Sequence, residues 1–471
     1  MNPIPPAEFT ILHLGIGSFH RAHQAVYLQA LHEAGDRRWA LSGANLRPDM
    51  ADVLAALRAQ DGRYTLETVS PAGEYRYQQI ESIREVIPYE PRLAAVIARG
   101  AAPSTRIVSF TVTEAGYYID AKGKLDMSFA DLVADIGRVQ RGEVGQTIYG
   151  ALVAILAARR SGDGGPVTLL NCDNLRHNGE RVRAGLLEFI ERVGDMDLLV
   201  WVKAFTRCPN AMVDRITPRP PPELRERVKA ATGRDDGAAV TGESFIQWVI
   251  EDDFIAGRPD WGRVGVELVG SVQPYEEAKI RILNATHSCI AWAGTLVGLN
   301  FIHEGTHDAE IRKFAFDYVT DDVIPCLHSP EHPSPIDLAA YRDVVLDRFG
   351  NPSIKDTNQR VAADGFSKIP GFIAPTIRER LAAGGSIESV AMLPALFLAF
   401  LQRWHAGQLS YAYQDQGMDP AVAHAICAAQ DPVAALCADR LLWGNLAGDE
   451  RLVAAVRGAG DRVAAFLARR A

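Results

Sequence analysis

The sequence predicts an α/β protein whose first half forms a doubly wound sheet and whose second half is mostly α-helical. Up to about residue 275, short apolar runs typical of buried strands alternate with helical patterns, which favours a parallel sheet with helices on both faces. Beyond residue 275 the apolar periodicity is helical and almost no strand pattern remains. At 471 residues the chain is long enough for more than one domain. We therefore expect two domains, at 1–275 and 276–471.

The elements of the first half begin with a β-prone run that ends at a Gly-Ile-Gly turn. A stretch with helical spacing follows and stops at Gly35, a residue type common at helix ends. Later strands and helices are bounded by turn residues in the same way. Strands are expected at 9–14, 39–43, 106–112 and 167–171, and helices at 20–33, 50–60 and 147–160.

The second half is expected to consist of helices joined by loops. Proline-rich 218–222, before the domain boundary, and the His-, Pro- and Ser-containing stretch at 328–335 predict surface loops. Helical periodicity is found at 274–298, 308–325, 336–348, 387–406, 420–428, 431–442 and 450–470.

Composition and charge exclude several classes of protein. Lys plus Arg total 49 and Asp plus Glu total 58, and the net charge of −9 argues against a nucleic-acid or anionic-membrane partner. No apolar run approaches the about 18 residues of a membrane span, and residues 1–9 lack the pattern of a secretion signal. The six cysteines show no CxxC spacing, so we expect free thiols, a reducing cytoplasm and no metal site.

The Gly-Ile-Gly turn predicts a dinucleotide cofactor in a Rossmann-like domain. Gly15 permits a tight turn after the first strand, and Gly17 lets the backbone approach a phosphate at the helix N-terminus. The third position of the G-x-G-x-x-G pattern is His20, which is expected to move the helix slightly away from the strand. Glycine turns also occur at strand–helix junctions for steric reasons alone, so this motif by itself is weak.

A dinucleotide-binding domain is expected to carry an acidic residue after its second strand that binds the adenosine ribose. Asp49 is the first carboxylate after the second strand, and it would accept the ribose 2′-OH and exclude a 2′-phosphate. Arg47 would instead favour NADP. Asp49 is equally well explained as a start residue of the helix at 50–60. We expect NAD as the cofactor.

The segment 276–292 predicts a buried helix with polar groups on one arc. At about 100° per residue, Glu276, His287 and Asn284 lie about 60°, 80° and 140° from Lys279. A buried lysine without an ion partner becomes a general base, and an amide and an imidazole beside it stabilise a developing alkoxide. This arrangement suits proton removal from an alcohol during hydride transfer to a nicotinamide. The alternative is an internal ion pair between Glu276 and Lys279.

Several motifs resemble the polyol-specific long-chain dehydrogenases, also called the mannitol dehydrogenase family. The block at 14–24 resembles their cofactor turn, and the K-x4-N-x2-H of Lys279, Asn284 and His287 resembles their catalytic signature. Further blocks in the order of the family lie at 113–117, 171–174, 212–218 and 358–370, so the resemblance covers residues 11 to about 370.

The resemblance implies NAD-dependent, metal-independent oxidation of a secondary alcohol of a linear C5 or C6 polyol to a ketose, first of all D-arabinitol to D-xylulose. The alternatives within the family are oxidation of mannitol at C2 and reduction of a hexuronate such as fructuronate or tagaturonate. A remote alternative is a nucleotide-binding protein without catalysis. The site is expected in the cleft between the domains, and the protein is expected to be a monomer or a weak homodimer.

The resemblance also implies roles for individual residues. Lys279 would be the general base, Asn284 and Asn174 would hold the alkoxide oxygen, and His287 would position the substrate oxygen. Supporting roles are implied for Asp214 and Glu276 in the catalytic group, for Arg360, Lys368 and Glu114 at the substrate, and for Gly15, Gly17, Ser18, Phe19, Arg21 and Asp49 at the cofactor.

Each of these roles has a structural alternative. Asp214 could form a local ion pair with Arg215, and Arg360 and Lys368 could be solvated loop charges. His20 and His23 are expected to be structural or near the phosphates. Asn171 and Asn178 are near neighbours of Asn174, so the sequence alone does not decide which of the three completes the oxyanion site.

Overall fold

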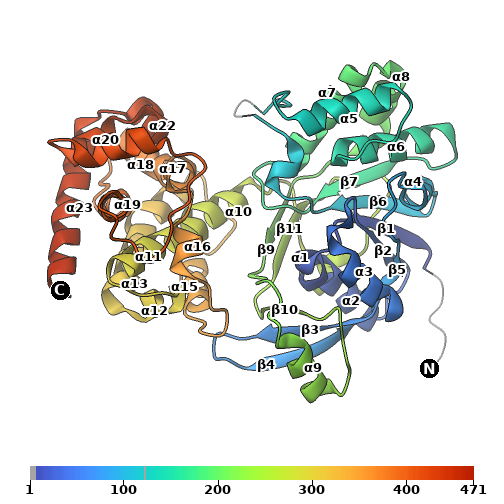
Figure 1. Ribbon diagram of the computed structural model, residues 1–471, viewed down its shortest axis with the longest axis horizontal. Coiled ribbons are helices and arrows are strands. Elements are labelled where there is room, and N and C mark those ends of the chain that lie inside the picture. The colour runs from blue at the N-terminus through green and yellow to red at the C-terminus, as the bar shows by residue number, and fades with distance from the viewer. Residues whose placement is uncertain (1–6, 121–122, 471) are drawn as a thin grey trace. The chain divides into compact units, whose positions relative to one another are not determined.

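The computed structural model describes residues 7–120 and 123–470 and divides into two compact units (Figure 1). The N-terminal unit ends at Gln273, and the helical unit begins at Pro274. The short segment Pro71–Gly73 also belongs to the helical unit. The strands named below all lie in the N-terminal unit.

A six-stranded parallel sheet forms the centre of the N-terminal unit and confirms the predicted doubly wound fold. The order of its strands is β5 (Ile83–Val86), β2 (Trp39–Ala44), β1 (Phe9–Leu14), β6 (Thr105–Phe110), β7 (Val167–Asn171) and β8 (Thr206–Arg207). This order reverses between β1 and β6, where sheets of this kind bind ligands beyond the carboxyl ends of their strands.

Helices and apolar cores cover both faces of this sheet (Figure 1). The predicted helix at 20–33 is in fact two helices. It begins at Ser18 and breaks at His23, whose Nε2 lies 2.8 Å from the Gln247 carbonyl oxygen. The helices are α1 (Ser18–Ala22), α2 (Gln24–Glu33), α3 (Ala51–Ala59), α4 (Ala94–Ala101), α5 (Ala130–Gln140), α6 (Ile148–Ser161), α7 (Asn178–Val193), α8 (Met196–Phe205) and α9 (Leu224–Thr232), with 3₁₀ turns η1 (Pro48–Met50), η2 (Glu114–Tyr117) and η3 (Trp261–Val264).

Two three-stranded sheets were not predicted from the sequence. One has the order β10 (Val240–Glu243), β3 (Tyr64–Val69), β4 (Tyr75–Ile80), and the other has the order β12 (Glu267–Val269), β11 (Gln247–Glu251), β9 (Ala211–Asp214). Four of these strands are only three to five residues long and β4 is largely polar, so their apolar patterns are weak, whereas β3 alternates apolar and polar residues over Tyr64–Glu67.

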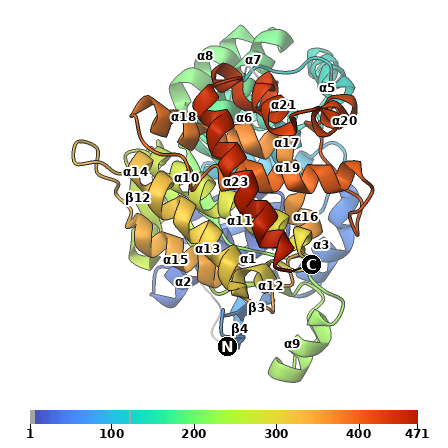
Figure 2. The ribbon, with the colours of Figure 1, turned by 90° about the vertical axis from the view of Figure 1, so that its left-hand side faces the viewer.

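The helical unit is built around α11 (Ala285–Leu296), which is buried along nearly its whole length. It packs against α12 (Ile302–His307), α13 (Ala309–Tyr318), α16 (Asn358–Ala362) and α19 (Met392–His405). Figure 2 shows α23 (Glu450–Ala468) crossing this group of helices, and α23 packs on α19. The other helices are α10 (Gln273–Ala278), α14 (Ile324–Leu327), α15 (Leu338–Phe349), α17 (Gly365–Lys368), α18 (Ala374–Ala382), α20 (Pro420–Ala428), α21 (Pro432–Ala438) and α22 (Arg440–Trp443), with the 3₁₀ turn η7 (Gly444–Leu446).

Three π-helical turns interrupt the helices of this unit. They are η4 (Lys279–Asn284), η5 (Val319–Val323) and η6 (Ile369–Ile373), and η4 packs against both of the others. A π-turn is uncommon and is found mostly at functional sites. The sequence pattern predicts regular helices here and gives no sign of the change. No helix in the described residues is long and apolar enough to cross a membrane.

Candidate active site

Four of the predicted catalytic residues lie on the continuous helix formed by α10, η4 and α11, namely Glu276, Lys279, Asn284 and His287. Within η4 the backbone bonds run from residue i to residue i+5, as in the bond from the Ala285 N–H to the Ile280 carbonyl oxygen. Lys279 and Asn284 are five residues apart and therefore lie almost one above the other, whereas a regular α-helix would separate them by about 140°. His287 follows Asn284 by three residues and stays on the same side. The sequence places Lys279, Asn284 and His287 on a broad arc of a regular helix, and the π-turn brings them onto one face.

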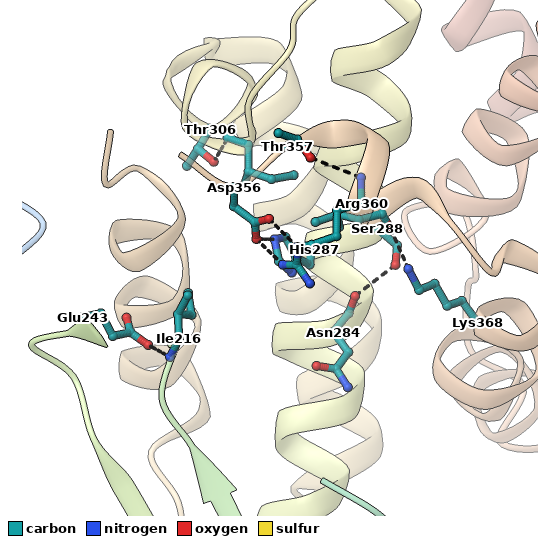
Figure 3. Close-up of polar contacts among 12 residues, drawn as sticks. Ile216, Glu243, Asn284, His287, Ser288, Thr306, Asp356, Thr357, Arg360 and Lys368 are labelled. Atoms are coloured by element: carbon teal, nitrogen blue, oxygen red, sulfur yellow. Dashed lines mark hydrogen bonds and ion pairs between the residues drawn. The ribbon is translucent and has the colours of Figure 1, made fainter. Parts of the chain in front are cut away.

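The polar residues of this face differ in exposure. Lys279 and Glu276 are buried, with 7% and 5% of their surface exposed, and both interact with neighbouring groups. Asn284 and His287 are half-buried. The carbonyl oxygen of Asn284 accepts a 3.1 Å bond from the Ser288 hydroxyl, and its side-chain amide extends away from that bond (Figure 3).

His287 is held on two sides. Its ring stacks on Phe349 with 4.3 Å between ring centroids, and its Nε2 lies 3.1 Å from Oδ2 of Asp356 (Figure 3). Burial lowers the pKa of His287 below 6.5; Asp356 opposes this change, while Arg360 and Lys368 add to it. The imidazole is therefore neutral at pH 7. We place its proton on Nε2, toward the carboxylate, which leaves Nδ1 as an acceptor.

Asp356 is the anion at the centre of this cluster. It accepts bonds of 2.7 Å and 2.5 Å from Nε and Nη2 of Arg360, the geometry of a planar fork on a carboxylate (Figure 3). Burial acts to raise the pKa of Asp356, but His287 and Arg360 outweigh it and hold the pKa well below its usual range. Lys355, the preceding residue, has φ of 52°, so a tight turn presents the carboxylate.

Lys368 completes the group of cations. Its Nζ donates a 2.5 Å bond to the Val361 carbonyl oxygen, and burial lowers its pKa to about 8. Lys368 is thus not a solvated loop charge, and it remains mostly protonated at pH 7. The side chain of Arg360 is 67% exposed but is ion-paired with Asp356. His287, Arg360 and Lys368 therefore come together around one carboxylate.

In the N-terminal unit, the turn after β1 has the geometry that a bound phosphate needs. Gly15 has φ of 106°, and a Cβ there would lie 2.0 Å from the Thr111 carbonyl oxygen, so only glycine fits. The Ile16 N–H donates a 2.7 Å bond to Oδ1 of Asn45. A Cβ on Gly17 would meet almost nothing, so this side of the turn is open, and α1 begins at the next residue.

Buried side chains support this turn. The rings of His13 and His20 stack 3.5 Å apart, and Nε2 of His13 lies 3.1 Å from the Gly15 carbonyl oxygen. Arg21 is 1% exposed and donates from Nε to the Gly17 carbonyl oxygen at 3.3 Å and from Nη1 to the carbonyl oxygen of Ala238. This burial leaves the guanidinium no surface for a direct cofactor contact, so the structure favours support of the turn as its role.

The other residues expected at the cofactor are accessible. Ser18 and Phe19 are half-buried, and Asp49 and Arg47 are exposed. Asp49 lies in η1, and neither η1 nor α3 begins with a side-chain cap. The carboxylate of Asp49 therefore does not cap the helix at its start. If Asp49 serves as a helix-start residue, as the alternative prediction has it, its contribution is limited to a favourable interaction with the helix dipole.

The loop after β6 has a strained backbone. Thr113 has φ of 70°, a conformation rare for a β-branched residue. Asp173, in the loop after β7, accepts bonds from the N–H groups of Val112 at 2.8 Å and Thr113 at 3.1 Å, and from the hydroxyl of Tyr117. Burial raises the pKa of Asp173, although these bonds oppose it. Glu114 begins η2, and its side chain lies outside the described part of the structure.

The three asparagines near the end of β7 differ in their surroundings. Asn178 is buried and exchanges bonds of 2.7 Å and 2.9 Å with the main chain of Ala211. Asn171 is buried, and its Nδ2 donates to the Asn178 carbonyl oxygen at 3.2 Å. Asn174 is exposed. Of the three, Asn174 has the accessibility that a substrate contact requires.

Main-chain bonds also fix the segment after β9. Asp214, the last residue of β9, is 5% exposed. Arg215 donates to the carbonyl oxygens of Glu243 at 2.9 Å and Ala22 at 2.6 Å. The carboxylate of Glu243 accepts a 2.5 Å bond from the Ile216 N–H (Figure 3). The backbone on the carboxyl side of Asp214 is therefore held in place.

Asp356, Phe349 and Asp173 were not predicted as site residues. Asp356 and Arg360 are separated by four residues, and this spacing of opposite charges is a signal that could have been used. Nothing in the sequence pairs Phe349 with His287, or Asp173 with the loop after β6. Among the described residues, no group of three His, Cys, Asp or Glu side chains is arranged to hold a metal ion.

Comparison with known families gives matches over both units. Residues 9–263 match the mannitol dehydrogenase Rossmann domain, and residues 271–464 match the mannitol dehydrogenase C-terminal domain.

Curated relatives and solved structures match nearly the whole chain. D-arabinitol 4-dehydrogenase of Ralstonia nicotianae is 60% identical over 98% of this chain and 97% of its own length. The enzyme of the same name from Klebsiella pneumoniae is 53% identical over 97% and 98%. The structure of Pseudomonas fluorescens mannitol 2-dehydrogenase with NAD and D-mannitol has a TM-score of 0.80 and 33% identity, and it covers 98% of this chain and 94% of its own.

Proposed function

Since the chain belongs to the mannitol dehydrogenase family, we propose that it oxidises a secondary alcohol of a linear polyol to a ketose with NAD, most specifically D-arabinitol to D-xylulose at C4. The observation that carries the proposal is the full-length similarity, at 60% and 53% identity, to two enzymes named D-arabinitol 4-dehydrogenase. The face formed by Lys279, Asn284 and His287 supplies the chemistry that this reaction needs.

The N-terminal unit fits a dinucleotide. Gly15 can only be glycine because of the Thr111 carbonyl oxygen, Gly17 leaves its side of the turn open, and α1 starts there. Asp49 would accept the 2′-OH of the adenosine ribose, which favours NAD over NADP. When bound, NAD supplies the hydride acceptor.

The residues of the helical unit move and hold the proton. Nζ of Lys279 takes the proton of the substrate hydroxyl, and Glu276 helps it to leave. Asn284 donates an amide N–H to the alkoxide oxygen, and the resemblance assigns the same role to Asn174. Neutral His287 positions a substrate hydroxyl through Nδ1. Arg360, Lys368 and Glu114 bind further hydroxyls, and Asp214 supports the catalytic group electrostatically.

The charges of the helical unit favour a neutral polyol over a hexuronate. The guanidinium of Arg360 is neutralised by the carboxylate of Asp356. The ammonium of Lys368 bonds to a main-chain carbonyl oxygen and interacts electrostatically with the carboxylates of Asp364 and Asp415. A substrate carboxylate would need a cation that is not already compensated. Oxidation of mannitol at C2 remains the second candidate, because it would use the same residues.

We place the protein in the cytoplasm as a monomer or weak homodimer. The six cysteines are all free thiols, which supports a reducing compartment. Sedimentation of the purified protein over a range of concentrations tests the oligomeric state.

The proposed function is tested by NADH absorbance with NAD⁺ and D-arabinitol, D-mannitol, ribitol or xylitol. We expect the highest kcat/KM with D-arabinitol, and NADH oxidation with D-xylulose in the reverse direction. A higher kcat/KM with D-mannitol would favour the second candidate. No reaction with any polyol, ketose or hexuronate would contradict the proposal.

A further inference from the structure

The π-turn η4 needs a hydrogen-bond donor from outside its own helix. At the end of η4, backbone hydrogen bonds of the i→i+5 type are replaced by the i→i+4 bonds of α11. Because the spacing of the bonds changes there, a carbonyl oxygen at the junction is left without a backbone donor. The Ala285 N–H bonds to the carbonyl oxygens of Ile280 and Ile282 and passes over that of Arg281, which places this junction at the Arg281 carbonyl group. A buried carbonyl group without a donor is unfavourable, so a regular α-helix would replace the π-turn if nothing else supplied the bond.

Tyr318 supplies that bond. It is the last residue of α13, it is 1% exposed, and its hydroxyl oxygen lies 3.2 Å from the Arg281 carbonyl oxygen and 3.3 Å from that of Ile282. The hydroxyl of Thr286 lies 2.6 Å from the same oxygen. Each hydroxyl has one proton, so Thr286 donates to Tyr318, and Tyr318 donates to the two carbonyl groups in a three-centre bond.

We propose that Tyr318 is a positioning residue for the oxidation step, because it holds η4 in the π-helical form that aligns Lys279 with Asn284. The inference rests on the proposed function, in which Lys279 is the general base. Without the hydroxyl, the α-helical ladder is favoured, and the segment with Lys279 turns away from the segment with Asn284 and His287. The base and the amide then no longer meet the same substrate oxygen.

A second restraint limits how far the turn can relax. Arg281 lies on η4 and donates to Glu277 at 2.7 Å and to both carboxylate oxygens of Glu379 at 2.6 Å and 2.7 Å. This ion group keeps the helix attached to α18 when Tyr318 is changed. The loss of the hydroxyl is therefore expected to misalign the site while the unit stays folded.

The test compares two tyrosines whose hydroxyls bond to the same continuous helix. Tyr318→Phe removes the bond to the π-turn. Tyr411→Phe removes a 2.7 Å bond to Thr295, which lies further along α11. Since a displacement of about 1 Å at a reacting centre can lower turnover ~100-fold, we expect kcat with D-arabinitol to fall ~10- to 100-fold in Tyr318→Phe. Tyr411→Phe is expected to keep kcat within about twofold, because it leaves the π-turn intact. NADH binding, followed by fluorescence, should be unchanged in both variants.

A double-mutant cycle separates alignment from a general loss of packing. If Tyr318 acts by aligning Lys279, then Tyr318→Phe should have little further effect on kcat in a Lys279→Ala background. Fully additive effects, an unchanged kcat in Tyr318→Phe, or an equal loss in Tyr411→Phe would each overturn the inference.

Two threonine variants keep the inference testable if Tyr318→Phe does not fold. Thr286→Val removes the donor that orients the Tyr318 hydroxyl, and Thr295→Val is its matched control. A selective loss of kcat in Thr286→Val supports the inference, and equal activity of the two variants overturns it. Wild-type protein without activity on any polyol would overturn the proposed function itself, whereas active wild type beside an equally active Tyr318→Phe would overturn only the role of Tyr318.

Discussion

The two units hold their polar groups in place by different means. In the N-terminal unit, the candidate residues lie in loops after parallel strands, and buried side chains such as Arg21 and Asp173 bond to the main chain of those loops. In the helical unit, the candidate residues lie on a helix that contains a π-helical turn. One unit uses side chains to fix a backbone, and the other uses a backbone to align side chains.

This difference predicts how each unit responds to substitution. Changes in the N-terminal unit should alter cofactor affinity and stability, because they loosen loops. Changes in the helical unit should alter turnover and polyol affinity, because they displace the groups that we propose to contact the reacting oxygen. Each prediction below tests one side of this division.

The largest effect is expected for Lys279→Ala. Loss of a general base lowers turnover by about 10²- to 10⁴-fold, and NADH affinity should be unchanged because the N-terminal unit is intact. Steady-state NADH absorbance gives kcat, and fluorescence gives NADH affinity. Lys313→Ala is the matched control, since this exposed lysine pairs only with Asp317 among the contacts seen in the described residues. Near-normal kcat in Lys279→Ala would refute the general-base role.

Asp356→Asn tests the ion cluster of the helical unit. The neutral amide loses the charge that neutralises Arg360 and orients His287, and a hydrogen bond to a charged group is worth about 1.5–3 kcal/mol. We expect KM for D-arabinitol to rise about 10- to 100-fold without a change in KM for NAD⁺. Asp347→Asn serves as the control, because Asp347 is exposed and pairs with Arg312. An unchanged polyol KM would show that the cluster does not contact substrate.

Asp173→Asn tests the loops of the N-terminal unit. An amide nitrogen cannot accept a hydrogen bond, so at least one donor among Val112, Thr113 and Tyr117 is left without its acceptor. We expect a loss of about 1–3 kcal/mol in the free energy of unfolding by urea and a higher KM for NAD⁺. Tyr117→Phe should show a smaller part of the same effect. Unchanged stability and cofactor KM would contradict the supporting role of Asp173.

Asp49→Ser tests the cofactor preference. With the carboxylate removed and Arg47 retained, the preference for NAD⁺ over NADP⁺ should fall about 10-fold, because one charge-assisted bond to the ribose is lost. The ratio of the two kcat/KM values measures this change. Asp52→Ser, in the exposed first turn of α3, should leave the ratio as it is. An unchanged ratio in Asp49→Ser would assign the selection of cofactor to another residue.

The smallest effect is expected from the titration of Lys368. Because burial lowers its pKa to about 8, the ammonium is lost as the pH rises through 8, and KM for the polyol should rise about threefold between about pH 7 and 9. In Lys368→Gln this rise should be absent. Between 8 and the ordinary value of 10.5 the unfolded chain binds the extra proton, so this group stabilises the fold as the pH increases. A rise in KM there is therefore not caused by a loss of stability from the titration of Lys368.

The features that could be predicted are those with a local signature. The strands at 9–14 and 167–171 and the glycine turn follow from apolar runs and from the freedom of glycine, and the structure places them there. The face with Lys279, Asn284 and His287 was predicted as a broad arc. Its narrowing depends on a hydrogen bond from Tyr318, 34 residues beyond Asn284, and no local pattern encodes such a bond.

The unpredicted site residues share this non-local character. Asp173 holds a loop 60 residues earlier in the chain, and Asp356, in the loop before α16, meets His287 on α11. The break at His23 likewise depends on a carbonyl oxygen of Gln247. Sequence periodicity identifies which side of a helix is buried, but it does not identify which distant donor or acceptor completes the site.

The stacked histidines behind the glycine turn make this part of the molecule sensitive to acid. Burial lowers the pKa of His13 to about 3, and it lowers the pKa of His20 well below 6.5, where the proximity of His13 contributes as well. Once unfolded, both rings would take up protons below pH 6.5, so each costs about 1.4 kcal/mol of stability per pH unit below that value. His20, which stands in the place of a third glycine, therefore makes the turn after β1 less stable as the pH falls below neutrality.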